Sequence, residues 1–287
     1  MIPEVSLIIS VFNQLDYTKR CLSCIEKTLK GKITYEVLIV DDGSNEETIN
    51  YLRSLEDPHY VSFNADSRGF AKNNNLASSQ ARGEYLCLLN NDVFVEGDWL
   101  SPMIKVFQKE EKVGLVGNVQ RLAFSNCFDH MGVVFGPWGN PRHYGQWFKK
   151  IKFRGEVRKW SAVTAACCVV RRADFLAIGG FDEIYLNGCE DVDLCLRFNR
   201  QGCNHYVVHD SVVLHVKGAS AGRKLFNDRN SEILLKRWGQ EIRAEESITD
   251  QVLHARNYLY RGFVRPFSTH FFKWLEALLI YFRLKRL

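Results

Sequence analysis

The segment CLLNNDVF, residues 87–94, places three oxygen-bearing side chains directly after an apolar run. Asn90, Asn91 and Asp92 interrupt a stretch that is otherwise typical of a buried strand. Such oxygens are ligands for hard cations like Mg²⁺ and Mn²⁺, which take one or two carboxylates and complete their shell with phosphate and water. A type I turn explains the same residues, because Asn and Asp hydrogen-bond to their own backbone. The segment alone favours neither interpretation.

A second acidic group lies in NGCEDVDLCLR, residues 187–197. Glu190, Asp191 and Asp193 crowd three carboxylates at the start of a predicted helix. Acidic side chains also favour helix N-termini through the helix dipole, so a structural role is open. The Asn-Gly pair before them predicts a turn, however. A carboxylate exposed at a turn-to-helix junction can serve as a general base.

Two further segments carry candidate ligands. In VVLHVKGAS, residues 212–220, a predicted strand ends in His215, which is either a metal ligand or a structural histidine. In NADSRGFAKNNN, Gly69 permits close backbone approach, and Arg68 and Lys72 can face a diphosphate. The alternative is a loop with solvated charges.

The elements that must position these residues alternate between strand and helix. The predicted strands of the first half are residues 5–11, 35–44, 59–64 and 84–90, and the helices between them are residues 15–31, 45–55 and 73–81. This alternation indicates βαβ units and a mostly parallel sheet. Ligands bind at the carboxyl ends of such strands. Polar residues follow each strand there: Asn13, Asp41, Asp42, Asn64, Asp66 and Asn90 to Asp92.

The second half is less regular. Strands are expected at residues 113–118, 161–172 and 205–216, and a helix at residues 191–202. Residues 120–160 are rich in Gly, Trp, His and Phe, and we expect an irregular pocket wall there.

Composition limits the function classes. The chain has 287 residues, 46% hydrophobic content and a net charge of +5, without the basic repeats that track nucleic acid, so we expect no nucleic-acid partner. Nine cysteines, several of them inside apolar segments, favour a reducing cytoplasmic compartment. The N-terminus lacks the basic region and cleavage site of a signal peptide. No uncharged apolar run reaches the ~18–20 residues of a membrane span.

The chain divides into one domain over residues 1–240 and a helical tail over residues 241–287. As a helix, the tail gathers four apolar side chains on one face, before a basic end: Phe272, Leu275, Leu279 and Phe282. Such a face suits the surface of an anionic membrane, or packing on the domain or in a homodimer. We therefore expect a cytoplasmic protein, either free or peripheral on the inner face of the cell membrane.

Seven segments in order resemble family 2 glycosyltransferases: VSLIISVFN, VLIVDDGS, NADSRGFAKNNN, YLCLLNNDV, GGFDE, NGCEDVDLCLR and LHVKGAS. The similarity covers roughly residues 4–240 and is closest to the bacterial rhamnosyltransferase-like branch, which builds surface polysaccharides. It implies an α/β A-type glycosyltransferase fold, with a mostly parallel sheet flanked by helices, a Rossmann-like nucleotide-binding half and an acceptor half. It also implies a UDP- or dTDP-sugar donor, Mn²⁺ or Mg²⁺, and a glycan or lipid-linked saccharide acceptor.

The resemblance also implies roles for individual residues. Asp92 and His215 match the metal ligands, and Asp191 matches the catalytic base, with Glu190 beside it. Asn90 takes the first position of the family's D-x-D motif, where Asn in place of Asp removes one negative charge. The predicted donor-binding residues are Asn13, Asp41, Asp42, Asp66, Arg68, Gly69, Asn90 and Asn91. The predicted acceptor-binding residues are Trp138, Glu190 and Asp193.

The chemistry agrees with these roles. Sugar transfer from a diphosphate requires a neutralised leaving group and removal of a proton from the acceptor hydroxyl. One positioned carboxylate is enough for in-line displacement with inversion. A sugar-nucleotide pyrophosphorylase would need a Gly-rich basic N-terminal loop, which ISVFNQLDYTK does not provide. An inactive sugar-nucleotide-binding module would have lost Asp92, Asp191 or His215, and all three are present.

Overall fold

Four parallel strands form the N-terminal half of the sheet, as the alternation predicted. They are β1 (Val5–Val11), β2 (Tyr35–Asp41), β3 (His59–Phe63) and β4 (Tyr85–Leu89), in the order β3-β2-β1-β4. The connecting helices are α1 (Leu15–Leu29), α2 (Glu46–Arg53) and α3 (Phe70–Gln80). β1, β2 and β4 are buried along nearly their whole length, as expected for strands covered on both faces. The computed structural model describes residues 2–125, 127–136, 139–150, 157–218, 225–245 and 248–284.

One antiparallel strand joins this half to the rest of the sheet. β11 (Cys167–Arg171) lies between β4 and β6 (Val113–Leu122), and β12 (Asn204–His215) runs parallel to β6. The antiparallel edge strands are β10 (Val157–Trp160) and β5 (Val93–Val95) beside β12, and β7 (Phe128–His130) beside β6. The predicted α/β class with a mostly parallel sheet is confirmed.

The strand expected over residues 161–172 was wrong in its first half. β11 begins only at Cys167, which pairs with Leu89, the last residue of β4. Val163 and Thr164 lie outside the described strands, and Ala165 and Ala166 form a turn. This turn lies beside the ends of the parallel strands, where it contributes to the site described below.

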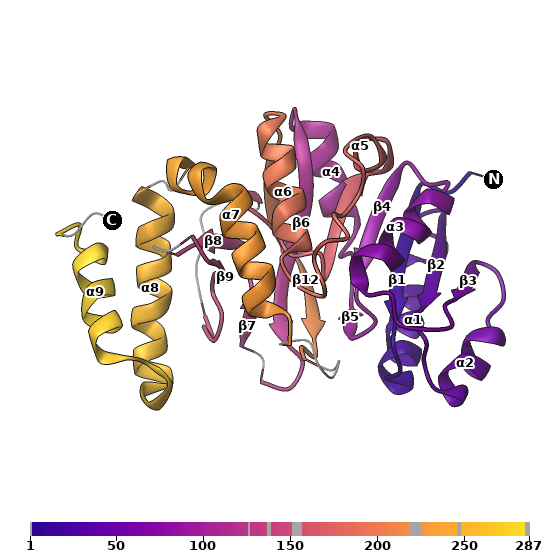
Figure 1. Cartoon of the computed structure of the whole chain (residues 1–287). Helices are drawn as coiled ribbons and strands as arrows, with labels where there is room; N and C mark the ends of the chain where they lie inside the picture. Colours follow the sequence, from indigo (N-terminus) through magenta and orange to yellow (C-terminus); the bar gives the residue numbers. More distant parts are fainter. Residues whose placement is uncertain are drawn as a thin grey trace.

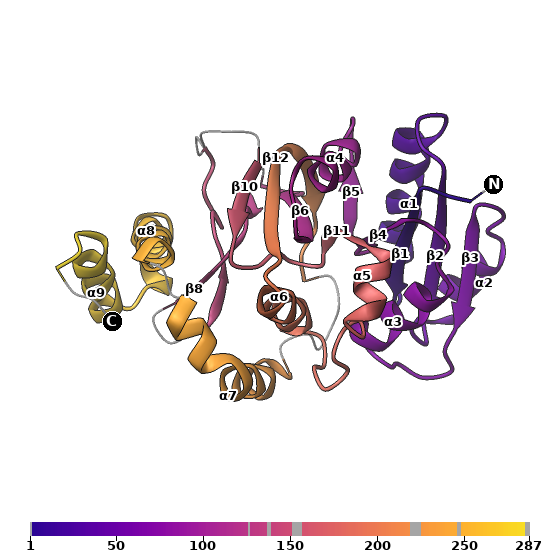
Figure 2. The same cartoon turned by 90° about the horizontal axis from the view of Figure 1, so that it is seen from above.

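Helices cover both faces of the sheet (Figures 1 and 2). α1 and α4 (Ser101–Lys109) lie on one face, where Ile25 and Phe107 join an apolar cluster with the strands. α3, α5 (Arg172–Ala177) and α6 (Glu190–Arg200) lie on the other face, where Phe175 and Phe198 join a second cluster. The two cores fix the sheet between two layers of helices, and the strand ends remain at its edge.

Residues 120–160, expected to be irregular, contain short strands in their described part. Besides β7 and β10 they include a separate two-stranded sheet of β8 (Val133–Phe135) and β9 (Pro141–His143). Every residue of β7 and β8 is buried. The segment is therefore part of the core of the second half and not only a surface lid.

Helices make up the C-terminal part: α7 (Asn227–Glu245), α8 (Ile248–Val264), the short 3₁₀ helix η1 (Pro266–Ser268) and α9 (Phe271–Tyr281). The boundary expected at residue 240 lies inside α7, whose Trp238 and Ile242 are buried in one cluster with Phe135. α8 and α9 pack together at the end of the molecule opposite β3 (Figure 1). In the described part of the chain, every helix is too short or too polar to span a bilayer.

Candidate active site

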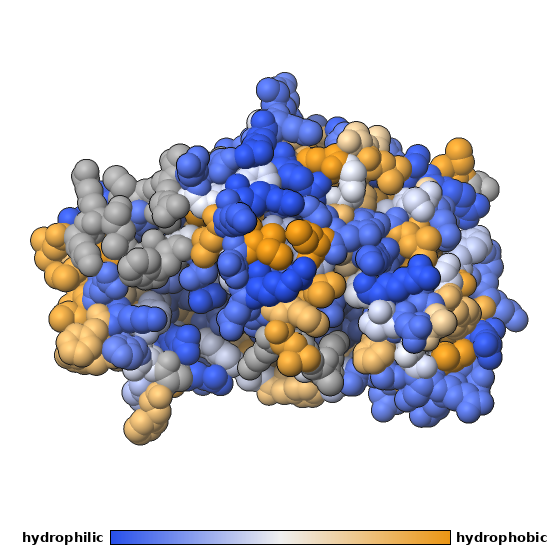
Figure 3. Space-filling view, in the orientation of Figure 1, coloured by the Kyte–Doolittle hydropathy of each residue, from blue (hydrophilic) through white to orange (hydrophobic). Residues whose placement is uncertain are grey.

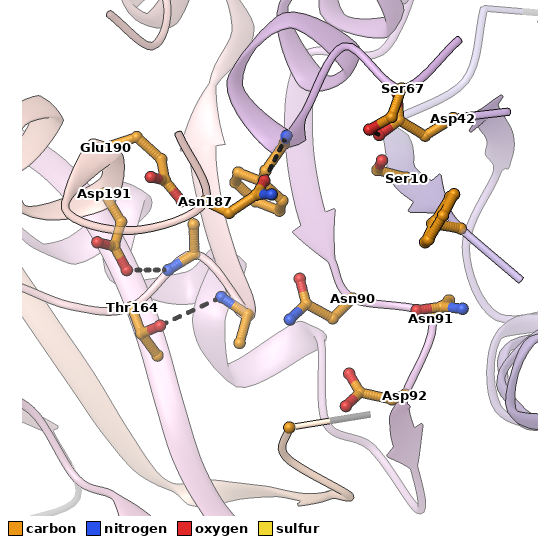
Figure 4. Close-up of a pocket in the computed structure, with 15 residues that line it drawn as sticks. Ser10, Asp42, Ser67, Asn90, Asn91, Asp92, Thr164, Asn187, Glu190 and Asp191 are labelled. Carbon is orange, nitrogen blue, oxygen red and sulfur yellow. Dashed lines mark hydrogen bonds between the residues drawn. The ribbon is translucent and has the colours of Figure 1, made fainter. Parts of the chain in front are cut away.

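A pocket of about 200 Å³ opens where the parallel strands end. Its lining comes from both halves of the molecule: Ser10, Phe12, Asp42, Ser67, Phe70, Asn90, Asn91, Asp92, Thr164, Ala165, Ala166, Asn187, Glu190, Asp191 and Gly218. Figure 4 shows Asp92 on one side of this pocket and Glu190 and Asp191 on the other. Six residues predicted from the sequence thus share one cavity: Asp42, Asn90, Asn91, Asp92, Glu190 and Asp191.

The Asn90 to Asp92 segment is both a turn and a pocket wall. The Val93 amide donates to the Asn90 carbonyl at 3.1 Å, which closes a tight turn between β4 and β5. The Asn90 amide donates to the Ala166 carbonyl, and the Asn91 side chain donates to Thr18 of α1. These bonds hold the turn against its neighbours. The side chains of Asn90 and Asp92 remain directed at the pocket (Figure 4).

Asp92 and His215 come together although 123 positions of sequence separate them. β5 pairs with the end of β12 in a register that sets Val93 opposite His215, so the residue before Val93 lies next to the ring. The Nε2 atom of His215 is 3.3 Å from Oδ1 of Asp92. The two side chains are nearly buried, at 2% exposure for His215 and 6% for Asp92.

Asp129, which the sequence analysis did not single out, lies on the other side of the His215 ring. Its Oδ2 atom is 3.3 Å from Nδ1 of His215, and its Oδ1 atom accepts from Lys217 and from Gln146. Asp129 is completely buried. The only sequence signal was an acidic residue next to a histidine, FDH, inside an otherwise apolar segment.

The two carboxylates beside His215 favour the protonated, positively charged form of its ring. Burial alone lowers the pKa of an imidazole, but the contacts with Asp129 and Asp92 outweigh it and raise the pKa of His215. For Asp129, burial raises the pKa, yet contact with His215 and the charges of His143 and Lys217 lower it overall. Asp129 is therefore ionised although it is fully buried, because its positively charged neighbours stabilise the carboxylate.

The Asp92 and His215 pair fits two ligands of a divalent ion. Two neighbouring ligands of an octahedral ion, each about 2.1 Å from it, are about 3 Å apart. The 3.3 Å between Oδ1 and Nε2 is close to that separation. No group of three His, Cys, Asp or Glu side chains in the described ranges forms a metal site by itself. Two protein ligands leave the remaining positions to phosphate oxygens and water, as Mg²⁺ and Mn²⁺ commonly require.

Asp191 stands at the N-terminal end of α6, which begins at Glu190. Asn187 and Cys189 have left-handed backbone conformations, with φ of 53° and 71°, so the chain turns sharply into the helix. Oδ2 of Asp191 accepts from the Ala165 amide at 3.2 Å, and Oδ1 accepts from the Val192 amide at 2.9 Å. Two backbone donors from separate segments thus fix this carboxylate at the edge of the pocket.

Glu190 and Asp193 have different positions. Oε2 of Glu190 accepts from the Gly188 amide at 2.5 Å, which closes its own turn, and the residue lines the pocket. Asp193, predicted to bind the acceptor, is completely buried and does not line the pocket. Its carboxylate accepts hydrogen bonds from four side chains: Tyr185, Arg197, Arg237 and Trp238. A buried carboxylate with four donors holds α6 to α7, so the predicted contact of Asp193 with the acceptor has no support in the described lining.

The acidic pair after β2 mainly orders loops. Asp42 accepts from the Ser67 hydroxyl and the Arg68 amide, each at 2.6 Å, and from the Gly69 amide at 3.2 Å. Asp41 is fully buried, and its Oδ2 accepts from the amides of Gly43 and Ser44. Asp42 reaches the pocket wall, whereas Asp41 is behind it.

The other predicted donor residues lie around the pocket and not in its lining. The Asn13 side chain accepts from the Asn45 amide, which ties β1 to the start of α2. Asp66 and Arg68 are exposed, and Arg68 borders a separate hollow with Lys72 and Glu183. The prediction that Arg68 and Lys72 face the main pocket therefore has no support in the described lining.

Gly69 and Trp138 complete the predicted set. Gly69 precedes α3 with φ of 86°, a conformation that L side chains rarely adopt. The next amide, that of Phe70, donates to the Asn187 side chain at 3.0 Å, so the two sides of the pocket are joined there. Trp138, predicted to contact the acceptor, lies outside the described residues.

The family model for "Glycosyl transferase family 2" matches residues 6–178. The chain belongs to this family. It is 32% identical over 227 residues to the O-antigen biosynthesis protein RfbC of Myxococcus xanthus, a match that covers 76% of this chain and 18% of that protein. It is 33% identical over 93 residues to a Mycobacterium tuberculosis N-acetylglucosaminyl-diphospho-decaprenol L-rhamnosyltransferase, covering 32% of this chain and 30% of that one. The matches thus span less than a third of each relative's length.

A solved structure supports the fold. The crystal structure of GalNAc-T7 with UDP, GalNAc and Mn²⁺ superposes with a TM-score of 0.67 at 16% identity, covering 84% of this chain and 50% of that one. The predicted A-type glycosyltransferase fold is therefore confirmed. The assignments of individual site residues stay predictions.

Proposed function

We propose that this family 2 glycosyltransferase inverts the anomeric carbon and depends on a divalent metal. In this proposal it moves a sugar from a UDP- or dTDP-linked donor to a hydroxyl of a glycan or lipid-linked saccharide during surface polysaccharide synthesis. The observation that carries the proposal is one pocket with Asp92, backed by His215, on one side and Asp191 on the other. Leaving-group stabilisation and proton removal are the two demands of an in-line displacement.

In the proposed mechanism, Asp92 and His215 would hold Mn²⁺ or Mg²⁺, which would neutralise charge on the diphosphate leaving group. Asp191 accepts the proton of the acceptor hydroxyl as that oxygen approaches the anomeric carbon. The Ala165 and Val192 amides keep its oxygens in place, so little reorganisation is needed. Glu190, on the same pocket wall, is proposed to orient the acceptor. A single base on this side is consistent with inversion and not with a covalent intermediate.

Donor binding is proposed for the polar ends of β1, β2 and β4. Asp42, Asn90 and Asn91 support it because they line the pocket. Asp41 has one buried oxygen, Oδ1, without a hydrogen bond among the described residues, which suits a further donor from the nucleobase. Asn13, Arg68 and Gly69 would act by shaping the loops around it, whereas Asp66 is exposed at the rim. The rhamnosyltransferase and O-antigen relatives favour a deoxyhexose or hexose donor.

We also propose that the C-terminal helices bind the inner face of the cell membrane. Phe271, Phe272 and Phe282 are 67%, 71% and 61% exposed. Apolar residues gather at this end of the molecule in Figure 3. The exposed basic residues in this part of the chain, residues 248–284, are Arg256, Arg261, Arg265, Lys273 and Arg283. Apolar side chains among basic ones suit an anionic lipid surface and a lipid-linked acceptor.

A pair of substitutions tests the membrane proposal. Phe272→Asp with Phe282→Asp should weaken binding to vesicles containing anionic lipid about tenfold or more, because two large apolar contacts become charges. Ile2→Asp, at the opposite end of the molecule and 81% exposed in the native residue, is the matched control. Unchanged vesicle binding together with the loss of a dimer in light scattering would favour a homodimer instead.

A donor screen tests the main proposal. Release of nucleoside diphosphate is measured for each sugar nucleotide with Mn²⁺ or Mg²⁺, in the presence of candidate saccharide acceptors. We expect turnover with one UDP- or dTDP-sugar, loss of turnover on chelation and recovery when the metal is restored. Full activity in excess chelator contradicts the metal, and a product that retains the donor's anomeric configuration contradicts inversion. Donor binding without any transfer would favour an inactive binding module.

A further inference from the structure

A bulge in β7 directs Asp129 at His215. In the pairing of β6 with β7, Gln120 faces His130 and Arg121 faces Phe128, so Asp129 is an extra residue between two partners. A bulge of this kind re-aims a side chain, and bulges are frequent beside active sites. The strand next to β6 on its other side is β12, which ends in His215 opposite Leu122. The bulge thus brings the Asp129 carboxylate to the imidazole.

The two oxygens of Asp129 are divided between different partners. Oδ1 accepts from the Lys217 ammonium, which anchors the carboxylate, and from the neutral Gln146 amide. Oδ2 is 3.3 Å from Nδ1 of His215, and neither atom has a hydrogen bond to another group in the described part of the chain. A carboxylate can accept but not donate, so Asp129 favours hydrogen on Nδ1, and Asp92, at the same distance, favours hydrogen on Nε2. A metal ion bound at Nε2 would exclude hydrogen from that atom and leave Nδ1 as the protonated nitrogen facing Asp129.

We propose that Asp129 is a positioning residue that orients His215 for the metal. With hydrogen on Nδ1, the lone pair of the ring is on Nε2, the atom that faces Asp92. Asp129 is completely buried and does not line the pocket, so it acts through the histidine and touches neither metal nor donor. A carboxylate behind a ligating histidine raises the basicity of the ligand, and losing it typically costs about 10- to 100-fold in metal affinity. This inference rests on the proposed metal site.

A double-mutant cycle separates positioning from a merely structural role. Mn²⁺ is titrated by calorimetry into wild type, Asp129→Asn, His215→Ala and the double variant, each alone and with saturating UDP or dTDP. Asp129→Asn should weaken Mn²⁺ binding about 10- to 100-fold. In the His215→Ala background the same change should have almost no further effect. Gln146→Met removes a neutral donor from the same carboxylate, and it should leave Mn²⁺ affinity near wild type.

Nitrogen NMR of the wild-type protein gives a readout that needs no substitution at Asp129. With diamagnetic Mg²⁺ and nucleotide bound, the His215 ring should carry hydrogen on Nδ1 and none on Nε2, with the signals assigned by their loss in His215→Ala. Hydrogen on Nε2, or a loss of Mn²⁺ affinity that persists in the His215→Ala background, overturns the positioning role. Wild-type affinity in Asp129→Asn also overturns it while the metal site stands. If the wild type binds no Mn²⁺, the metal-dependent proposal fails together with this inference.

Discussion

Two acidic turns of this molecule look alike in sequence and differ in structure. Asp41 and Asp42 follow β2, and Glu190, Asp191 and Asp193 begin α6. In the first turn the carboxylates accept hydrogen bonds from loops: Asp42 alone accepts from Ser67 and from the amides of Arg68 and Gly69. In the second turn, Asp193 belongs to a buried hydrogen-bond network and Glu190 accepts from the Gly188 amide of its own turn. Asp191 lies at the edge of the pocket.

The comparison shows what identifies a reactive carboxylate. Acidic residues at a strand end or a helix start are equally plausible candidates when only their types and spacing are known. In the structure, burial and the number of donors separate them. Asp193 has four side-chain donors and no exposure, whereas Asp191 has two backbone donors and borders the cavity. A group that is held firmly, yet still faces the pocket, is suited to proton transfer.

The largest effect is expected for Asp191→Asn. Loss of a general base typically lowers kcat by about 10²–10⁴. The new amide group also places an N–H against the amide of Ala165 or Val192, so thermal stability must be measured beside the rate. Donor affinity, measured by calorimetry, should stay near wild type. An unchanged kcat would move the base to Glu190, and a collapse of donor affinity would make Asp191 a binding residue.

Asp193→Ala should instead reduce stability. It removes the shared acceptor of Arg197 and Arg237, and breaking a buried charge pair costs about 3–5 kcal/mol. Because both arginines keep some exposure, we expect the lower end of that range, about 3 kcal/mol, in denaturant unfolding. Activity per folded molecule should change little. A severe loss of kcat at unchanged stability would restore the acceptor-binding role predicted from the sequence.

The parts of the fold that the sequence predicted well share a simple cause. β1, β2 and β4 are continuous apolar runs because both of their faces are covered, and the pattern of such strands is local. The proximity of Asp92 and His215 came from the family resemblance, since their contact depends on the pairing of β5 with β12. Neither the strands nor the Asp92 and His215 pair required a prediction of loop conformation.

The missed features depend on long-range contacts. A bulge in the three-residue strand β7 sets the direction of the Asp129 side chain. So short a strand shows no alternating hydrophobic pattern in the sequence. The late start of β11 is set by the length of β4, its partner, and not by its own apolar sequence. Asp193 has the same residue type as Asp191, and only the approach of α7 with Arg237 and Trp238 turns it into a buried anchor. Sequence spacing alone cannot reveal such partners.

The smallest effect is expected at the first acidic turn, from Asp42→Asn. An amide has one acceptor oxygen in place of two, so at least one of the bonds to Ser67, Arg68 and Gly69 is lost. Because Asp42 and Ser67 both line the pocket, the loosened loop should weaken donor binding.

We expect the donor KM of Asp42→Asn to rise about tenfold, equivalent to about 1.4 kcal/mol, with kcat near wild type. Asp66→Asn is the matched control: Asp66 is an exposed acid in the loop after β3 that Asp42 orders, and the sequence also predicted it to bind the donor, but it does not line the pocket. Its KM should stay near wild type, because its carboxylate has no such set of loop bonds to lose. A larger rise in KM for Asp66→Asn than for Asp42→Asn would mean that direct contact at the rim, and not the order of the loop, governs donor affinity.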